Sequence, residues 1–148
     1  MIDVLRAAAI VRRGDAVLLR RRMRAPNAGF FELPEVEVAT GASTTKPPKH
    51  AFDAAGLSRL RRLLAAHLRA IHGLSVRLGV ALPLARHTIT RHRIATVPLL
   101  GRLQGGRVRQ PLSWVVLSPE SPVTTSSRRI LAAASAATPH PREHFRET

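Results

Sequence analysis

The chain has 148 residues, of which 45% are hydrophobic and only 3% aromatic. This length suits one domain, and the hydrophobic content excludes global disorder and implies a core of Leu, Val, Ile and Ala. The formal net charge is +15, from 24 Lys and Arg against 9 Asp and Glu, and all but two of the basic residues are Arg. Such a charge favours a polyanionic partner, although a genome rich in Arg codons would give the same composition.

Cysteine is absent, so disulfides, Cys-bound zinc and Cys-ligated iron–sulfur clusters are excluded within this chain. A reducing, cytoplasmic location is compatible with that absence and is the expected one. No run reaches 18 uncharged apolar residues, and the N-terminal segment is too short for a signal sequence, so neither a membrane span nor a membrane partner is expected.

Two short apolar runs at the N-terminus, 5–11 and 16–19, flank an Arg-Gly-Asp turn and predict a β-hairpin. The hairpin ends in a basic cluster, and strand alternation places Arg20 and Arg22 on one face and Arg21 on the other. Residues 36–38 predict a short strand, and Phe30 and Phe31 before it are expected in the core rather than stacked on a base. Residues 41–50 are rich in Pro, Ser and Thr and predict an exposed loop.

A long helix to about residue 71 follows, with Asp53 or Ser58 as its N-cap and Gly73 as its stop. Apolar residues at three- and four-residue spacing predict the buried stripe of this helix. The stripe comprises Leu57, Leu60, Leu64, Leu68 and Ile71. Three arginines fall off the stripe and are expected to be solvated, namely Arg59, Arg61 and Arg62.

Residues 74–84 and 88–103 predict two or three strands, and 114–117 a short buried strand with Trp114 in the core. Ser126 or Ser127 is expected to cap a last helix that runs through residue 137. Strands and helices in this order predict a single α+β domain over residues 1–137, with a flexible tail over 138–148.

Three segments carry a family pattern in the same order along the chain. They are AVLLRRR (16–22) followed by GFFELP (29–34), then HTITRHRI (87–94), and finally SWVVL (113–117) followed by RRIL (128–131). Together they resemble the Nudix superfamily, most closely the Nudix-like C-terminal domain of MutY-type adenine DNA glycosylases, whose patterns are LLRRR…aGlWEfP, HTFSHFHL and W…l…lp.P.rklL. The resemblance implies an α/β/α sandwich: a mixed sheet, a long helix after the Pro-rich loop and a C-terminal helix.

A Nudix hydrolase binds Mg²⁺ or Mn²⁺ through helix carboxylates in the motif G-x5-E-x7-R-E-U-x-E-E-x-G-U, because hard divalent cations take oxygen ligands. When the motif is anchored on Gly73 and Leu74, its first Glu falls on Ser58, its Arg-Glu pair on 66–67 and its Glu-Glu pair on 70–71. Residues 57–72 contain no carboxylate, only Arg and His among ionisable residues. We therefore expect no metal, no cofactor and no catalytic residue at this helix.

The remaining candidates for a metal site are weak. Glu32, Glu35 and Glu37 are the only clustered acids, and Glu35 and Glu37 are expected on one face of a solvated edge strand. His67 and His72 are five residues apart on a helix and are expected to point about 140° away from each other. His87 and His92 are expected on opposite strand faces, and a further pair in the tail, at 140 and 144, has ligand-like spacing.

In the glycosylases that this chain resembles, the Nudix-like domain helps recognise 8-oxoguanine opposite adenine, and a separate helical domain removes the adenine. The resemblance implies a non-catalytic DNA-repair domain that serves a glycosylase catalytic domain or subunit. Thr90 matches the family's Ser or Thr in the loop that approaches the oxidised guanine, although β-propensity alone also explains a strand Thr. Ile89 and Arg91 depart from the family's frequent Phe and His.

The predicted binding surface for DNA or nucleotide combines basic and hydroxyl residues from two segments. It comprises Arg20, Arg21, Arg22, Arg24, Arg86, Thr88, Thr90, Arg91 and Arg93. Two alternatives remain: a Nudix hydrolase of nucleoside diphosphate derivatives with an atypical metal site, and a metal-free module that binds nucleotide or protein.

Overall fold

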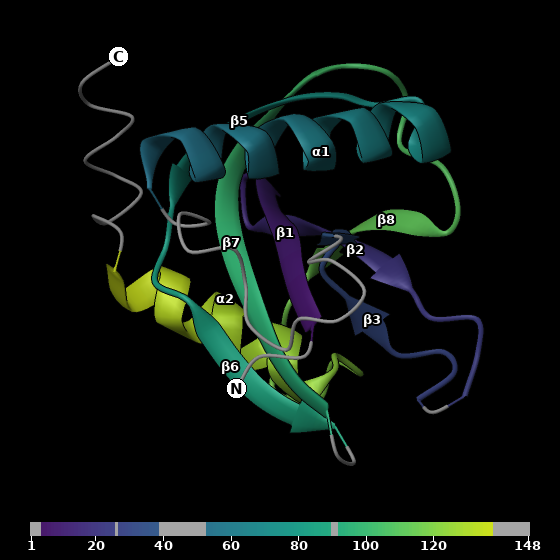
Figure 1. Cartoon of the computed structure of the whole chain (residues 1–148). Helices are drawn as coiled ribbons and strands as arrows, with labels where there is room; N and C mark the ends of the chain where they lie inside the picture. Colours follow the sequence, from purple (N-terminus) through teal and green to yellow (C-terminus); the bar gives the residue numbers. More distant parts are fainter. Residues whose placement is uncertain (1–3, 26, 39–52, 90–91, 138–148) are drawn as a thin grey trace.

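The computed structural model describes residues 4–25, 27–38, 53–89 and 92–137, and these form a mixed sheet between two helices (Figure 1). The helices are α1 (Ala54–His72) and α2 (Thr125–Ala137). The strands are β1 (Val4–Arg13), β2 (Ala16–Arg21), β3 (Phe31–Glu32), β4 (Glu35–Val38), β5 (Ser75–Ala81), β6 (Ala85–Ile89), β7 (His92–Gly105) and β8 (Leu112–Val116). The predicted α+β architecture is confirmed, and the region 74–103 resolves into three strands.

Strand β1 lies at the centre of the sheet. It pairs antiparallel with β4 on one side and parallel with β7 on the other, and β7 in turn pairs antiparallel with β5 and β6. Only the last two residues of β1 pair with β2, around a turn in which Gly14 has a positive φ of 57°. Strand β2 then pairs with β3 and β8, so these three strands extend the sheet beyond the C-terminal end of β1.

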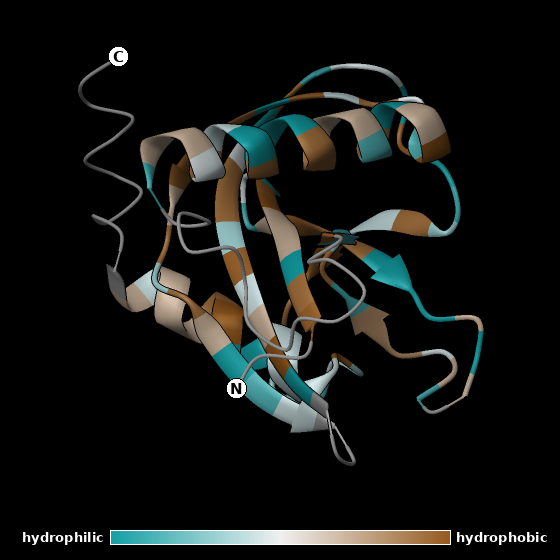
Figure 2. Ribbon diagram, viewed as in Figure 1, coloured by the Kyte–Doolittle hydropathy of each residue, from teal (hydrophilic) through white to brown (hydrophobic). Residues whose placement is uncertain are grey.

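Both faces of β1 are buried, because period-two alternation gives each face to a different helix. Leu5, Ala7, Ala9 and Val11 belong to the core under α1, and Ala8 and Ile10 belong to the core under α2. Figure 2 shows the resulting hydrophobic band running along the central strands between the two helices. The core is aliphatic, as the composition predicts.

Helix α1 begins at a side-chain cap, because the Asp53 carboxylate accepts a hydrogen bond of 2.8 Å from the Gly56 amide. It ends at Gly73, whose φ of 66° is left-handed. Leu60, Leu64 and Leu68 are buried as predicted. Ile71 is not: it is 64% exposed, because its side chain faces a hollow beside the last turn of the helix.

Two other sequence expectations are wrong in detail. Arg61 is not simply solvated, since its Nε donates a 2.8 Å hydrogen bond to the Gly79 carbonyl and ties α1 to β5. Phe30 is 39% exposed, whereas Phe31 packs half-buried against the core under α2. Trp114 is half-buried against the other core, with the Arg13 guanidinium 4.4 Å from its ring centroid.

The start of α2 also differs from the prediction. The helix begins at Thr125, and the Arg128 amide donates to the Thr124 carbonyl, so Thr124 rather than Ser126 or Ser127 occupies the N-cap position, although its own hydroxyl has no partner among the described residues. The buried Ser127 hydroxyl instead accepts a 3.0 Å hydrogen bond from the Leu33 amide and ties α2 to the segment between β3 and β4. The predicted loop at 41–50 and tail at 138–148 lie outside the described residues. Neither described helix is long and apolar enough to cross a membrane.

Candidate functional site

The predicted basic surface divides into separate parts. Alternation along β2 holds as expected: Arg20 and Arg22 both pair with Glu32, at 3.1 and 2.9 Å, while Arg21 lies on the other face with its guanidinium 5.8 Å from the Phe31 ring centroid. Arg24 follows in the loop and is exposed. The charges of Arg20 and Arg22 are therefore partly neutralised inside the chain.

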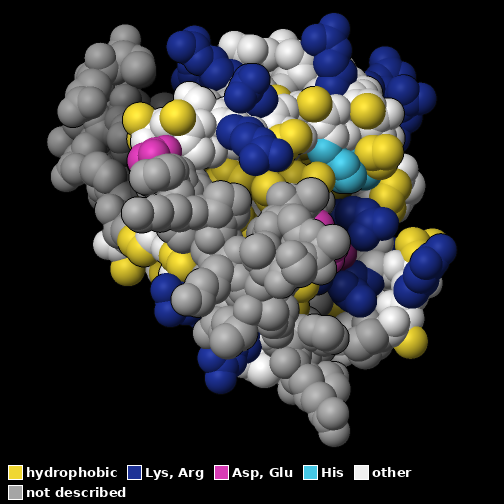
Figure 3. Space-filling model, viewed as in Figure 1, with side chains coloured by type: hydrophobic (Ala, Val, Ile, Leu, Met, Phe, Trp, Pro, Cys, Tyr) yellow, Lys and Arg dark blue, Asp and Glu magenta, His cyan; other side chains and the backbone are white. Residues whose placement is uncertain are grey.

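The second part is the hairpin of β6 and β7. Thr88 is the cross-strand neighbour of Arg93, and Arg86 lies two residues before Thr88 on the same face; all three are exposed. Thr90 and Arg91 lie outside the described residues. In Figure 3, Arg side chains gather over α1 and on two flanks, one over β6 and one near the end of β2.

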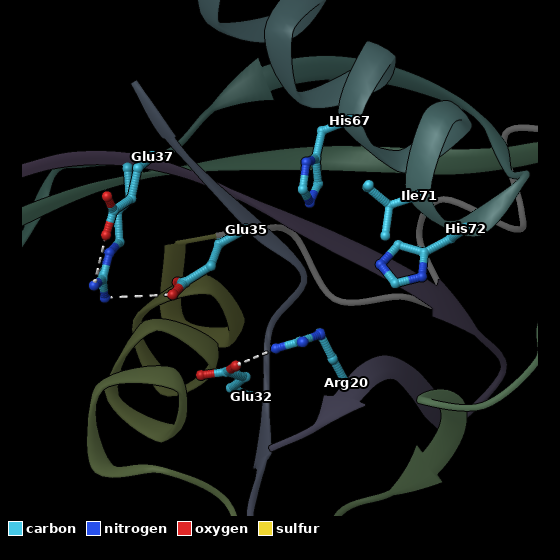
Figure 4. A pocket seen from close by; sticks show the side chains of 8 residues that line it. Arg20, Glu32, Glu35, Glu37, His67, Ile71 and His72 are labelled. Carbon is cyan, nitrogen blue, oxygen red and sulfur yellow. Dashed lines mark hydrogen bonds and ion pairs between the residues drawn. The ribbon is translucent and has the colours of Figure 1, made fainter. Parts of the chain in front are cut away.

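A cavity of about 290 Å³ lies between the last turns of α1 and the strand ends below it (Figure 4). We call it the ion-paired cavity. It is lined by Arg6, Arg20, Glu32, Glu35, Glu37, His67, Ile71 and His72. Arg6 reaches Glu35 at 3.3 Å and Glu37 at 3.2 Å, and Glu32 takes Arg20 and Arg22, so each carboxylate of this cavity has an arginine partner.

Burial perturbs the titrating groups of the ion-paired cavity. Desolvation raises the pKa of Glu35 to about 7, although Arg6 attracts its charged form. Burial, with Arg20 nearby, lowers the pKa values of His67 and His72, and their rings lie edge to face with centroids 6.2 Å apart. The expectation that these two histidines point apart is wrong, because both side chains extend from the end of the helix toward one hollow (Figure 4). The expectation of a solvated acidic edge holds only for Glu37, which is 66% exposed.

A second cavity, of about 390 Å³, lies between the N-terminus of α2, the end of β6 and the β3–β4 segment. We call it the hydroxyl cavity. It is lined by Arg6, Arg22, Asn27, Glu32, Glu35, His87, Thr88, Thr124, Thr125, Ser126 and Arg129. Arg22 and Thr88, which the sequence analysis assigned to one surface, both line this cavity.

Three buried polar atoms without described partners belong to residues that line the hydroxyl cavity. Arg6 Nε, His87 Nε2 and Thr124 Oγ1 are buried and have no hydrogen-bond partner among the described residues, and all three residues line this cavity. Burial, Arg6 and Arg129 lower the pKa of His87, so its imidazole is neutral at pH 7 and offers one donor and one acceptor. Sequence reasoning considered His87 only as half of a metal-binding pair. It assigned Thr124 and Arg129 to no site, because only the helix cap at Ser126 or Ser127 was sought in that segment.

Comparison with solved structures decides the fold. The chain matches a MutT Nudix hydrolase from Burkholderia pseudomallei at TM-score 0.59 and 22% identity, over 91% of this chain and 98% of that one. It matches a Nudix hydrolase from Nitrosomonas europaea at TM-score 0.63 and 12% identity, over 94% and 76%. The chain has the Nudix fold. No family model and no curated protein sequence matches it.

The Nudix fold is shared here with a protein of a different kind. The C-terminal domain of mouse MUTYH, solved in complex with human PCNA, matches at TM-score 0.55 and 17% identity, over 90% of this chain and 88% of that domain. At these identities the fold alone carries over to this chain. Structural neighbours thus include both Nudix hydrolases and the MUTYH C-terminal domain.

The ion-paired cavity occupies the place where this Nudix-fold chain differs most from the hydrolase motif. Two motif positions that require Glu, 67 and 71, hold His67 and Ile71, and both line the cavity. The described residues contain no group of three His, Asp or Glu that could hold a metal ion. A divalent ion needs several free oxygen ligands, and here the carboxylates are engaged by guanidinium groups, so these residues do not fit the hydrolases' metal.

Proposed function

We propose that this chain is a DNA-binding Nudix-fold domain that recognises a base rather than hydrolysing a diphosphate. In its specific form, the domain recognises 8-oxoguanine opposite adenine for an adenine glycosylase catalytic domain or subunit. The observation that carries the proposal is the hydroxyl cavity, whose lining includes Arg6, His87 and Thr124, each with a polar side-chain atom that has no partner among the described residues.

The chemistry of the hydroxyl cavity suits a nucleobase. Its volume of about 390 Å³ falls in the range of small-ligand sites. An Arg6 N–H group, a neutral imidazole and a hydroxyl together present both donors and acceptors, which is what reading a base edge requires.

Charge favours a nucleic-acid chain over a free nucleotide as the source of that base. Exposed Arg24 extends from the β2 side, and exposed Arg86 and Arg93 lie on the hairpin that also carries Thr88. Guanidinium groups on both flanks of a base site are suited to phosphates on either side of a displaced base. The net charge of +15 adds long-range attraction to any polyanion.

A binding assay on three duplexes tests the proposal. We expect a duplex with 8-oxoguanine opposite adenine to bind more tightly than the matched G·A and G·C duplexes. The logarithm of affinity should fall with log salt by about 0.9 per phosphate contact. Equal affinity for all three duplexes would reduce the function to general DNA binding, and no binding at low salt would remove it.

The same cavity supports a second candidate, a metal-free nucleotide module, because hydroxyls and a helix N-terminus also suit a phosphate. Saturable binding of mononucleotides without duplex binding would favour the nucleotide module over the DNA-binding domain. The hydrolase alternative is tested in parallel with a panel of nucleoside diphosphate derivatives and Mg²⁺ or Mn²⁺. Turnover that is lost in Glu32→Gln or Glu35→Gln would establish it over both.

A further inference from the structure

Three arginines stand in a row across three adjacent strands at the end of the sheet remote from the hydroxyl cavity. Arg77 on β5 and Arg102 on β7 are directly opposite cross-strand neighbours. Arg12 on β1 lies one residue beyond the parallel pair Val11 and Gly101, so it continues the row on the other side of Arg102. All three residues are exposed. We call them the arginine row.

The three side chains share the sheet face that α2 covers. A Cβ at Gly101 would meet the side chains of Val11, Val76 and Leu78, all of which belong to or pack against the core under α1. By alternation, Arg102 points to the opposite face, and so do Arg12 and Arg77. Arg12 Nη2 accordingly lies 3.4 Å from the Ser135 hydroxyl on α2.

Nothing in the described chain neutralises the arginine row. The ion pairs of Arg6, Arg20 and Arg22 involve only Glu32, Glu35 and Glu37, and no described acid pairs with Arg12, Arg77 or Arg102. Adjacent strands are about 4.8 Å apart, so the guanidinium groups repel one another, and like charges directly across a sheet are destabilising. An anion that bridges neighbouring members would relieve this repulsion.

The arginine row is also far from the proposed base site. Arg93 and Arg102 are nine residues apart on β7, which corresponds to about 30 Å along an extended strand. A free nucleotide in the hydroxyl cavity could not reach the row. A polymeric anion could, since one duplex strand spans the same distance in about nine nucleotides.

We propose that the arginine row is a second contact for nucleic-acid backbone, separate from the base site, which binds phosphates without reading sequence. The proposal rests on the function proposed above, because it takes nucleic acid as the partner. Arginine suits the role, since its planar fork can hold phosphate oxygens in pairs. A single chain therefore engages two stretches of backbone, one at each end of β7.

The experiment compares three variants of equal fold and similar charge. The row variant is Arg12→Gln/Arg77→Gln/Arg102→Gln, and its matched control removes three exposed arginines of α1, as Arg59→Gln/Arg62→Gln/Arg69→Gln. A third variant, Arg24→Gln/Arg86→Gln, weakens the flanks of the base site. Affinity for an undamaged duplex of about 30 base pairs is measured between 50 and 200 mM salt, and thermal unfolding confirms folding of each variant.

The measured quantity is the slope of log affinity against log salt concentration, to which each phosphate contact contributes about 0.9. We expect this slope to become shallower by about two to three in the row variant and by less than about one in the α1 control. Equal losses in both variants, or an unchanged slope in the row variant, would overturn the row as a contact. Loss in the row variant alone, with Arg24→Gln/Arg86→Gln unchanged, keeps the row and refutes the proposed base-site flanks. No duplex binding by the wild type refutes both. If the row variant loses only its affinity for anionic lipid vesicles, the partner is a membrane surface and the proposal is wrong.

Discussion

The two cavities lie on either side of the same three side chains, Arg6, Glu32 and Glu35, yet they differ in how far the chain satisfies its own polar groups. In the ion-paired cavity every carboxylate has an arginine partner, in contacts of 2.9–3.3 Å. The lining of the hydroxyl cavity shares Arg6, Glu32 and Glu35, and it adds an imidazole nitrogen of His87 and a hydroxyl of Thr124 that are buried without described partners.

The difference shows which cavity retains binding capacity. A carboxylate that already holds a guanidinium has little to offer a metal ion, because the cation would have to displace an arginine and leave it buried without its partner. An unpaired buried donor gains from any ligand that matches it. The carboxylates beside the position of the hydrolase motif are therefore already paired with arginines, and our proposal assigns binding to the neighbouring hydroxyl cavity.

The largest expected effect is a pH dependence of the unfolding free energy that comes from Glu35. Because burial raises the pKa of Glu35 to about 7, the folded state favours its protonated form. Its stabilising contribution is complete below the unfolded pKa of about 4.5 and is lost as pH rises through 7. We expect Glu35→Gln to gain about 2–3 kcal/mol of unfolding free energy relative to wild type between pH 4.5 and pH 8.

Urea unfolding at both pH values measures this difference. Wild type alone is not diagnostic, because the lowered pKa values of His67, His72 and His87 act in the opposite direction: these histidines destabilise the fold as pH falls below 6.5. Glu37→Gln, at an exposed position, is the control and should keep the wild-type pH dependence. A pH-independent difference between wild type and Glu35→Gln would mean that Glu35 is solvated.

The next effect separates the ion-paired carboxylates from one another. Glu32 is buried and holds two arginines, so Glu32→Gln should destabilise the fold by about 2 kcal/mol at pH 7. Glu37→Gln removes one exposed contact to Arg6 and should cost less than about 0.5 kcal/mol. Similar values for both variants in chemical denaturation would contradict the saturated-cluster interpretation.

Thr124 provides the corresponding test in the hydroxyl cavity. Thr124→Val removes a buried hydroxyl without a described partner, so the free protein should be as stable as wild type or more stable by up to about 1 kcal/mol. Affinity for the lesion duplex should nevertheless fall about tenfold, because the ligand loses a hydrogen bond. Thr124→Ser retains the hydroxyl and should restore binding. A parallel loss of stability and affinity in Thr124→Val would assign the hydroxyl a structural role instead.

The smallest effect comes from restoring one motif acid. Ile71 is 64% exposed, so Ile71→Glu should change the unfolding free energy by less than about 0.5 kcal/mol. The new carboxylate would share its hollow with Arg20 and His72, and we expect it to pair with them rather than with a metal. Thermal unfolding with and without Mg²⁺ checks this, since a Mg²⁺-dependent rise in Tm would show that a single acid suffices for a metal site.

Local patterns predicted most of the fold and part of the site. The cap at Asp53, the stop at Gly73 and the stripe of Leu60, Leu64 and Leu68 follow from turn chemistry and periodicity and are confirmed. The turn between β1 and β2 is confirmed too, although the run 5–11 pairs with β4 and β7 rather than with β2. The facing of Arg20 and Arg22 also followed from strand alternation. The prediction that Ile71 is buried was wrong, because helical periodicity carries no information on which turn of the helix the sheet leaves uncovered.

The sequence by itself determined the composition of the core, the order of the elements and the absence of acids from residues 57–72, because each depends on residue type and spacing alone. Only the tertiary structure decided which charges cancel and which polar atoms are left without partners. Arg6 meets Glu35 and Glu37 through β1–β4 pairing, and His87 lines the same cavity as Thr124 although the two are far apart in the chain. Both results depend on distances between residues remote in sequence, and such distances exist only once the strands have paired and the helices have packed.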